Sequence, residues 1–214
     1  LTPDAGTRVL ARGARVGYLP QEAAERYDGT VLERAMEAYH GLLAMREELD
    51  ALHQRLAGIA PDDPALEHLL ERTGELQHHL ELADEHALEP EARRVLSGLG
   101  FSVRDQDRQL AQFSGGWRMR AALAALLLTD PTLLFLDEPT NHLDLPAMEW
   151  MEDYLEDFHG ALVAVSHDRV FLDRVTDEVR ELEAGQLTTF ATNFTGYLEE
   201  RGLRRERIEA QNEQ

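Results

Sequence analysis

The stretch LLFLDEPTNHLD, Leu133–Asp144, decides the fold class of this 214-residue chain. Its first four residues are apolar, which is typical of a strand buried on both faces of a parallel sheet. Two adjacent carboxylates, Asp137 and Glu138, stand where that strand ends. Because α/β proteins bind ligands at the carboxyl ends of such strands, the stretch predicts a functional site at this point.

Strand-like and helical segments alternate outward from this stretch. A helix is predicted over residues 146–158, and an apolar strand, Ala161–Ser166, follows it. This alternation indicates an α/β fold with a mostly parallel sheet. The other strand-like segments are Val9–Leu19 and a closing hairpin of Val179–Leu182 with Gln186–Phe190.

Residues 31–87 have a helical pattern instead. Apolar or small residues recur there at alternating steps of four and three, which marks one face of each of two helices. The seam residues are Val31, Ala35, Ala38, Leu42, Met45, Leu49, Leu52 and Leu56, then Leu66, Leu69, Thr73, Leu76, Leu80, Ala83 and Ala87. The pattern predicts an antiparallel helical hairpin whose first helix is roughly 40 Å long. A hairpin that projects and one that packs on the body both fit. Asp63 and Pro64 suit the start of the second helix.

Composition narrows the classes of protein. No apolar run approaches the ~18 residues of a membrane span, and the first residues lack the pattern of a signal peptide. The absence of cysteine excludes disulfides and fits a cytoplasmic protein. The formal net charge is −20, which argues against a chain that coats nucleic acid. Residues 31–90 carry −10 of it and six of the nine histidines, for which solvated side chains are favoured over a metal site.

The Asp137-Glu138 pair suits phosphoryl transfer from a nucleotide, which needs Mg²⁺ and a positioned water. Asp137 would suit the metal, directly or through water. Glu138 would suit the polarisation of the attacking water as a general base. Alone, an apolar run before Asp-Glu is weak evidence, because most such pairs at strand ends have no catalytic role.

Further motifs stand in order around this pair. Ser114-Gly115-Gly116 begins 23 residues before Asp137, and His167 follows Glu138 by 29 residues, directly after an apolar strand. Gln21 ends the segment Gly17-Tyr18-Leu19-Pro20-Gln21. Together the motifs resemble those of ATP-binding-cassette (ABC) ATPases. The resemblance makes Ser-Gly-Gly the signature, Leu133–Glu138 Walker B, Asn141–Asp144 the D-loop, His167 the switch histidine and Gln21 the Q-loop glutamine.

The resemblance implies an ATPase with an ABC-type core, with ATP and Mg²⁺ as its cofactors. Its catalytic residues would be Glu138 and His167, with the imidazole donating to the γ-phosphate. Nucleotide would contact Gln21, Ser114, Gly115, Gly116, Asp137 and Asp144. Gly115 and Gly116 would let backbone N–H groups at a helix start approach a phosphate. Asp137 and Gln21 would hold Mg²⁺, and Asp144 would lie at the interface between two ATPase cores.

Two features resemble the first cassette of the soluble, translation-linked ABC-F branch. The signature continues Trp117-Arg118-Met119-Arg120, where transporter cassettes usually carry Gln in place of Trp117, and the tail from Asn193 resembles an inter-cassette linker. The implied domains are a remainder of the N-terminal core with the Q-loop (1–30), a helical subdomain with an arm-like hairpin (31–112), the core with the signature, Walker B, D-loop and switch histidine (113–192), and the start of the linker helix (193–214). A second cassette and the ribosome or tRNA are the implied partners, in the cytoplasm.

The chain departs from the family at one point. The P-loop G-x-x-x-x-G-K-[ST] needs a lysine, and all 21 basic residues here are arginine. The resemblance places Leu1–Gly6 just after the P-loop helix. We therefore expect a truncated cassette that alone binds ATP poorly and does not hydrolyse it. Two alternatives are a nucleotide-binding subunit of a membrane transporter and a non-catalytic, degenerate cassette.

Overall fold

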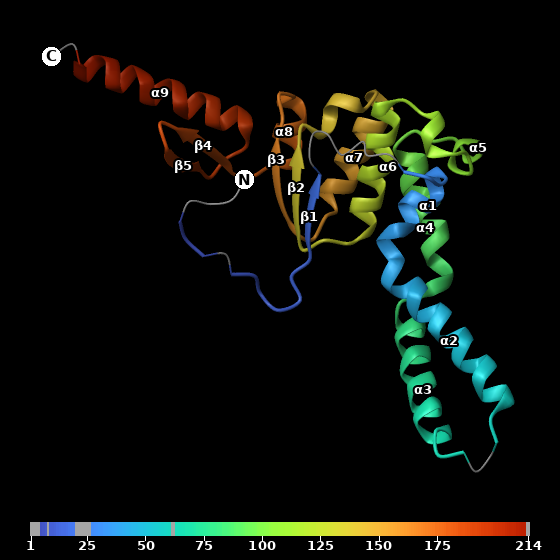
Figure 1. Ribbon diagram of the computed structural model, residues 1–214. Helices are drawn as coiled ribbons and strands as arrows, with labels where there is room; N and C mark the ends of the chain where they lie inside the picture. The colour runs from blue at the N-terminus through green and yellow to red at the C-terminus, as the bar shows by residue number, and fades with distance from the viewer. Residues whose placement is uncertain (1–4, 8, 20–26, 61–62, 213–214) are drawn as a thin grey trace. The chain divides into compact units, whose positions relative to one another are not determined.

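The computed structural model describes residues 5–7, 9–19, 27–60 and 63–212. The chain divides into two compact units. The sheet unit comprises residues 1–23 and 130–214, and the helical unit comprises residues 24–129. The predicted α/β fold is confirmed, because parallel strands and their connecting helices make up the sheet unit (Figure 1).

A three-stranded parallel sheet forms the centre of the sheet unit. Its strands are β1 (Val16–Leu19), β2 (Leu133–Asp137) and β3 (Ala161–Val165), in the order β1-β2-β3. Leu134 of β2 pairs with Gly17 on one side and with Leu162 on the other. Helices α7 (Leu145–Glu156) and α8 (Arg169–Val175) follow β2 and β3. The strand that carries the two carboxylates is therefore the central one.

One face of this sheet is buried and the other is open. Leu134 and Leu136 are 0% and 2% exposed, whereas Tyr18 and Val165 are both 59% exposed on the opposite face. Val163 lies on the same face as Tyr18, with Phe135 of β2 between them, and is 46% exposed. The prediction of strands buried on both faces is therefore wrong for one face, although the apolar residues expected for two buried faces are present.

An antiparallel pair of strands completes the β structure of the described residues. β4 (Val179–Glu183) and β5 (Gln186–Phe190) pair along their whole length, as predicted. The two residues between them, Ala184 and Gly185, both have positive φ (49° and 78°), the geometry that suits a two-residue hairpin turn. Helix α9 (Phe194–Asn212) follows.

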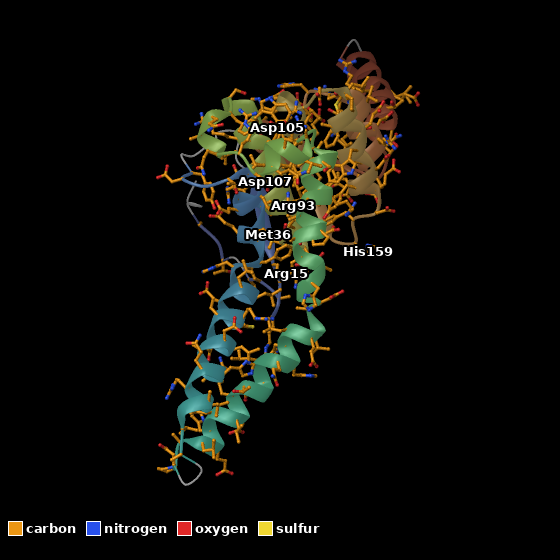
Figure 2. The ribbon with its side chains drawn as sticks, turned by 90° about the vertical axis from the view of Figure 1, so that its right-hand side faces the viewer. Arg15, Met36, Arg93, Asp105, Asp107 and His159 are labelled. Carbon is orange, nitrogen blue, oxygen red and sulfur yellow. The ribbon has the colours of Figure 1, made fainter. Side chains whose placement is uncertain are left out.

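The helical unit contains α1 (Val31–Met36), α2 (His40–Gly58), α3 (Leu66–Leu82), α4 (Glu85–Gly98), α5 (Val103–Gln106) and α6 (Gly115–Leu128), with short 3-10 turns η1 (Glu37–Tyr39) and η2 (Leu110–Gln112). Helices α1, α4 and α6 pack together. Val31, Val95 and Leu123, at most 1% exposed, lie in this core. Arg93 of α4 donates hydrogen bonds to Gln106, the last residue of α5, and to Asp107, the residue after it. Figure 2 labels Arg93 and Asp107.

The predicted helical hairpin is confirmed. α2 and α3 pack on each other and extend away from α1, α4 and α6 within the helical unit (Figure 1). The buried contact residues are the predicted seam residues Leu49, Leu52, Leu69, Leu76 and Leu80. Two interruptions were not predicted. The turn η1 separates α1 from α2, and Asp84, with a left-handed φ of 46°, separates α3 from α4.

The division into units differs from the sequence-based one. The predicted boundary at residue 113 groups the signature with the two carboxylates, whereas the structure divides the chain after Thr129. The reason is that α6, which follows Ser114, buries its apolar residues against α1 and α4. The signature therefore belongs structurally to the helical unit.

Candidate functional site

The ends of β2 and β3 bring the predicted catalytic residues together. The two strands are parallel neighbours, and the backbone N–H of Glu138 donates to the carbonyl of Val165 at 2.8 Å. Glu138 directly follows β2, and His167 stands two residues after the end of β3. Adjacent parallel strands thus place two residues that are 29 positions apart in sequence at one edge of the sheet.

Glu138 and His167 are in direct contact. The Glu138 carboxylate accepts a hydrogen bond from the His167 backbone N–H at 3.2 Å, and its other oxygen lies 3.6 Å from His167 Nε2. The Glu138 side chain is 10% exposed, whereas the His167 side chain is 98% exposed. The site therefore joins a shielded carboxylate to an imidazole that is open to a ligand.

The backbone of Glu138 is left-handed, with φ 50° and ψ 52°. A non-glycine residue in this region costs about 1–3 kcal/mol and persists only where its surroundings hold it. Pro139 begins a 3-10 turn, η3 (Pro139–His142), directly afterwards. The abrupt change from strand to turn aims the Glu138 side chain toward the end of β3.

Two hydroxyl groups connect the loops that follow β2 and β3. Thr140 Oγ1 and Ser166 Oγ are 3.3 Å apart, and Ser166 Oγ also accepts from the backbone N–H of Asp168 at 3.0 Å. The Asp168 carboxylate in turn accepts from the first N–H groups of α8, at Val170 and Phe171. Thr140 was not singled out from the sequence, because a threonine after Asp-Glu-Pro carries no signal of its partner 26 residues away.

The remaining acidic residues lie at element ends. Asp137 is the last residue of β2 and is half-buried, opposite Val165 in register. Asp144 is the residue before α7, is exposed and makes no capping bond to that helix. Gln21 lies outside the described residues. Within the described part of the chain, no group of three or more histidine or acidic residues is arranged to hold a metal.

The residues present nevertheless fit Mg²⁺. That ion typically takes one or two carboxylates and completes its shell with water and substrate phosphates. Asp137 is the half-buried last residue of β2, and its carboxylate is this kind of ligand. A site built around a nucleotide would therefore not require a closed cage of protein ligands.

The signature forms the start of a helix, as predicted. Ser114 precedes α6, has extended backbone angles and makes no side-chain capping bond. Gly115 faces open space, because a Cβ placed there would meet nothing within 4 Å. The start of this 14-residue helix has no side-chain cap, and at such a helix start an anion is favoured by unpaired N–H donors and by the helix dipole.

Trp117 anchors this helix start. Its ring packs edge-on against Phe101, with centroids 4.9 Å apart, and the Arg120 guanidinium lies 4.4 Å from the Trp117 ring centroid. Arg120 also donates to the carbonyl of Leu99. The residue that departs from the usual transporter signature therefore has a packing role, and it fixes the first turn of α6 against the turn at residues 99–101.

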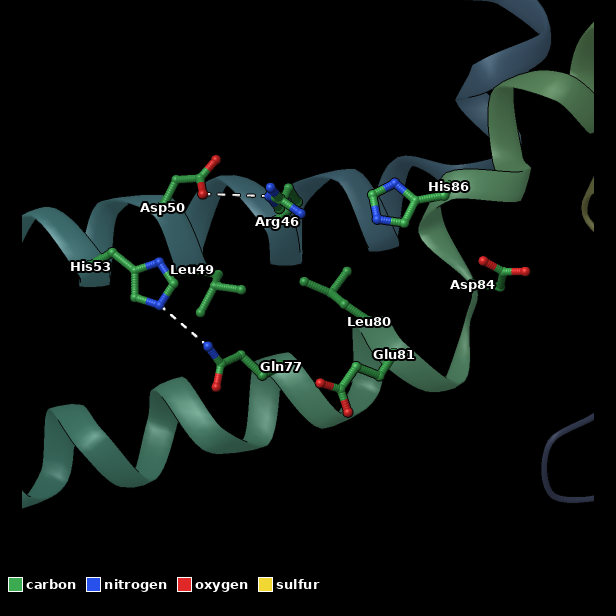
Figure 3. A pocket seen from close by; sticks show the side chains of 9 residues that line it. All are labelled: Arg46, Leu49, Asp50, His53, Gln77, Leu80, Glu81, Asp84 and His86. Atoms are coloured by element: carbon green, nitrogen blue, oxygen red, sulfur yellow. Dashed lines mark hydrogen bonds and ion pairs between the residues drawn. The ribbon is translucent and has the colours of Figure 1, made fainter.

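A separate cleft of about 510 Å³ lies between α2, α3 and the start of α4 (Figure 3). Leu49 and Leu80 face its interior, and a contact of 3.4 Å between Gln77 and His53 lies at one end. The other lining residues are Arg46, Asp50, Glu81, Asp84 and His86. None of the predicted nucleotide-site residues lines this cleft.

Comparison with known proteins gives the same family. The sequence pattern described as "ABC transporter" matches residues 4–141. The chain is 36% identical over 211 residues to "ABC transporter F family member 5" of Arabidopsis thaliana, covering 98% of this chain and 30% of that protein. It is 37% identical over 202 residues to "Energy-dependent translational throttle protein EttA" of Mycobacterium tuberculosis, covering 94% and 35%. The chain thus spans about a third of the length of these relatives.

A solved structure shows the same fold. The "Structure of ATP binding subunit of ABC transporter" superposes with a TM-score of 0.55 at 17% identity and covers 89% of this chain and 63% of that one. None of the described helices is both long enough and apolar enough to span a membrane.

Proposed function

Because the chain belongs to the ABC transporter family, we propose that it is the signature-bearing part of an ATP-binding and ATP-hydrolysing module. The observation that carries this proposal is the contact between Glu138 and His167 at the ends of two adjacent parallel strands. ATP hydrolysis needs a group that accepts a proton from water and a group that donates to the terminal phosphate. The contact brings two groups with these capacities together.

Glu138 is the general base in this proposal. Its carboxylate is fixed by the His167 backbone N–H and keeps a second oxygen beside the imidazole. A base held in one orientation loses little freedom when it accepts a proton. His167 donates from its exposed ring to the γ-phosphate. The bonds of Ser166 to Thr140 and to Asp168 hold the two loops in place during the reaction.

Asp137 and Gln21 are the residues proposed to hold Mg²⁺. When bound, the ion neutralises charge that develops on the transferred phosphate. Ser114, Gly115 and Gly116 form an anion site with backbone N–H groups, and Asp144 lies toward a second cassette. The sequence has no lysine, so the lysine that cradles the β- and γ-phosphates comes from outside residues 1–214 in this proposal.

Translation is the proposed setting. The relatives that support it carry the printed names of an F-family member and of a translational throttle protein. The Trp117 signature and the charged helix α9 are the features of this chain that resembled the same branch. We place the full-length protein in the cytoplasm, with a second cassette and the ribosome or tRNA as partners.

The test is made with the full-length protein that contains these residues. ATP turnover is measured for the wild type and for Glu138→Gln, and both are sedimented with 70S ribosomes and, separately, with membranes. We expect Mg²⁺-dependent turnover that falls at least a hundredfold in the variant, and ATP-dependent retention of the variant on ribosomes. Turnover that is unchanged by the substitution removes the catalytic assignment, and association with membranes alone favours the transporter alternative.

A further inference from the structure

Helix α8 follows the His167 site in sequence and forms hydrogen bonds with α9. It is only seven residues long and begins two residues after His167. Asp168 fixes its start through bonds from the N–H groups of Val170 and Phe171, at 3.0 and 3.1 Å. Phe171 is completely buried. Because α8 is short and is fixed at its start by Asp168, we take α8 and Asp168 to be one rigid piece.

At its other end α8 is fastened to α9 by Asp173. One carboxylate oxygen accepts from the backbone N–H of Thr195 at 2.7 Å, and the other accepts from the Thr195 hydroxyl at 2.6 Å. These bonds hold the pKa of Asp173 below its usual range. Thr195 is the second residue of α9. The Asp173 carboxylate of α8 thus lies at the N-terminus of α9, where the dipole of α9 favours its negative charge.

The helix start of α9 does not rest on Asp173 alone. Asn193 directly precedes α9, and its side chain accepts from the backbone N–H of Gly196 at 3.1 Å, the usual bond of an N-cap. A second cap from the preceding residue is therefore already present. The bonds of Asp173 are additional, and what they add is a connection between two helices.

The other bonds at the base of α9 lead to the β4–β5 pair. Tyr197 donates to Glu181 at 2.8 Å, and Arg201 pairs with the same carboxylate at 2.7 Å. The Tyr197 ring also packs edge-on against Phe190. Among these bonds between α9 and other elements in the described residues, those of Asp173 are the ones that lead toward the nucleotide site.

We propose that Asp173 is a positioning residue that makes α9 follow the state of His167. When the imidazole binds a phosphate, the loop that contains His167 shifts. Helix α8 shifts with this loop because Asp168 caps its start. The two bonds from Thr195 to Asp173 then displace the first turn of α9. This inference rests on the proposed function for its trigger, but the connection itself is a property of the chain and is tested without nucleotide.

The first test uses hydrogen exchange of the 214-residue chain without nucleotide. Asp173→Ala should raise exchange about tenfold in both α8 and the first turn of α9, because charge-assisted bonds of both are lost. Asn193→Ala is the matched control, since it removes only the local cap and should raise exchange in α9 alone. Asp173→Asn keeps one acceptor oxygen and should restore part of the protection. If Asp173→Ala leaves α8 unchanged, the proposal is overturned.

The second test follows exchange in the full-length protein with and without Mg²⁺ and ATP. In the wild type and in Asn193→Ala, nucleotide should change exchange at the base of α9. In Asp173→Ala that response should be lost, while KM for ATP stays within about twofold of wild type. A response that persists in Asp173→Ala overturns the coupling. Absence of turnover in the wild type contradicts the proposed function, and the first test still decides the connection.

Discussion

Nε2 of His167 lies 3.6 Å from a carboxylate oxygen of Glu138, although the imidazole is almost entirely exposed and the carboxylate almost entirely shielded. The asymmetry follows from the backbone. Glu138 turns inward through its left-handed conformation, and His167 leaves the end of β3 toward solvent. One partner is thus held in place and the other is free to meet a ligand.

His167→Ala should separate activity from stability. The side chain is 98% exposed, so the free energy of unfolding should change by no more than about 0.5 kcal/mol. The backbone N–H that donates to Glu138 is kept. ATP turnover of the full-length protein should nevertheless fall about a hundredfold or more. Urea unfolding of the chain and steady-state kinetics check the two parts, and a large loss of stability would show that the imidazole is structural.

Arg174→Met should be strongly destabilising. Arg174 pairs with Glu152 at 2.7 Å, and the Glu152 side chain is only 7% exposed. Removing the cation leaves a shielded carboxylate without its partner, so the free energy of unfolding should fall by more than it does when an exposed ion pair is lost. The double variant Arg174→Met with Glu152→Met should recover most of that loss in urea unfolding.

Arg180→Met is the matched control for this ion pair. Arg180 pairs with Glu178, and both side chains are well exposed, at 64% and 39%. Its loss should cost no more than about 1 kcal/mol. Equal effects of the two arginine substitutions would contradict the assignment of Arg174 as the partner of a buried charge.

Two Gly→Ala substitutions should have opposite signs. Gly100 has φ 95°, and a Cβ there would lie 2.9 Å from Nη1 of Arg120, so Ala should cost about 1–3 kcal/mol. Gly74 lies within α3, where a Cβ meets nothing within 4 Å. Ala there should stabilise by about 0.5–1 kcal/mol. Thermal unfolding measures both, and a tolerated Gly100→Ala would remove the argument that the Trp117–Arg120 contact is tightly packed.

The connection between Asp173 and Thr195 should depend on pH. Because the folded pKa of Asp173 is lowered, its contribution is fully present above the ordinary aspartate value of 3.8 and is lost as pH falls through the lowered value. An NMR titration of the Asp173 carboxyl carbon should have its midpoint below 3.8. Thr195→Val removes the hydroxyl donor and should raise that midpoint. A midpoint that does not respond would show that the hydroxyl bond is not the cause.

Local patterns were sufficient to predict much of this chain. The apolar seam from Val31 to Leu80 predicted the hairpin, because residues three and four positions apart lie on the same face of a helix. The apolar run before Asp137 gave the central strand, and the parallel arrangement brought Glu138 and His167 together as the family resemblance implied. These features depend on period and on order along the chain.

The features that were missed depend on tertiary contacts. No local signal marks Asp84 as a break between helices, because aspartate is common within helices as well as in turns. The link from Asp173 to Thr195 joins residues 22 positions apart, and each looks like an ordinary surface residue in sequence. The grouping of Ser114 with the helical unit follows from what α6 packs against, which its largely apolar sequence does not specify.

The uncovered side of the three-stranded sheet has a practical consequence for anyone who purifies this polypeptide. Val16 and Tyr18 of β1 and Val163 and Val165 of β3 expose apolar side chains on this face. Exposed apolar surface of this kind binds detergents and dyes and favours self-association. Apparent size should therefore drift with concentration in light scattering. Threonine at positions 163 and 165 would keep the β preference of valine while making the material better behaved.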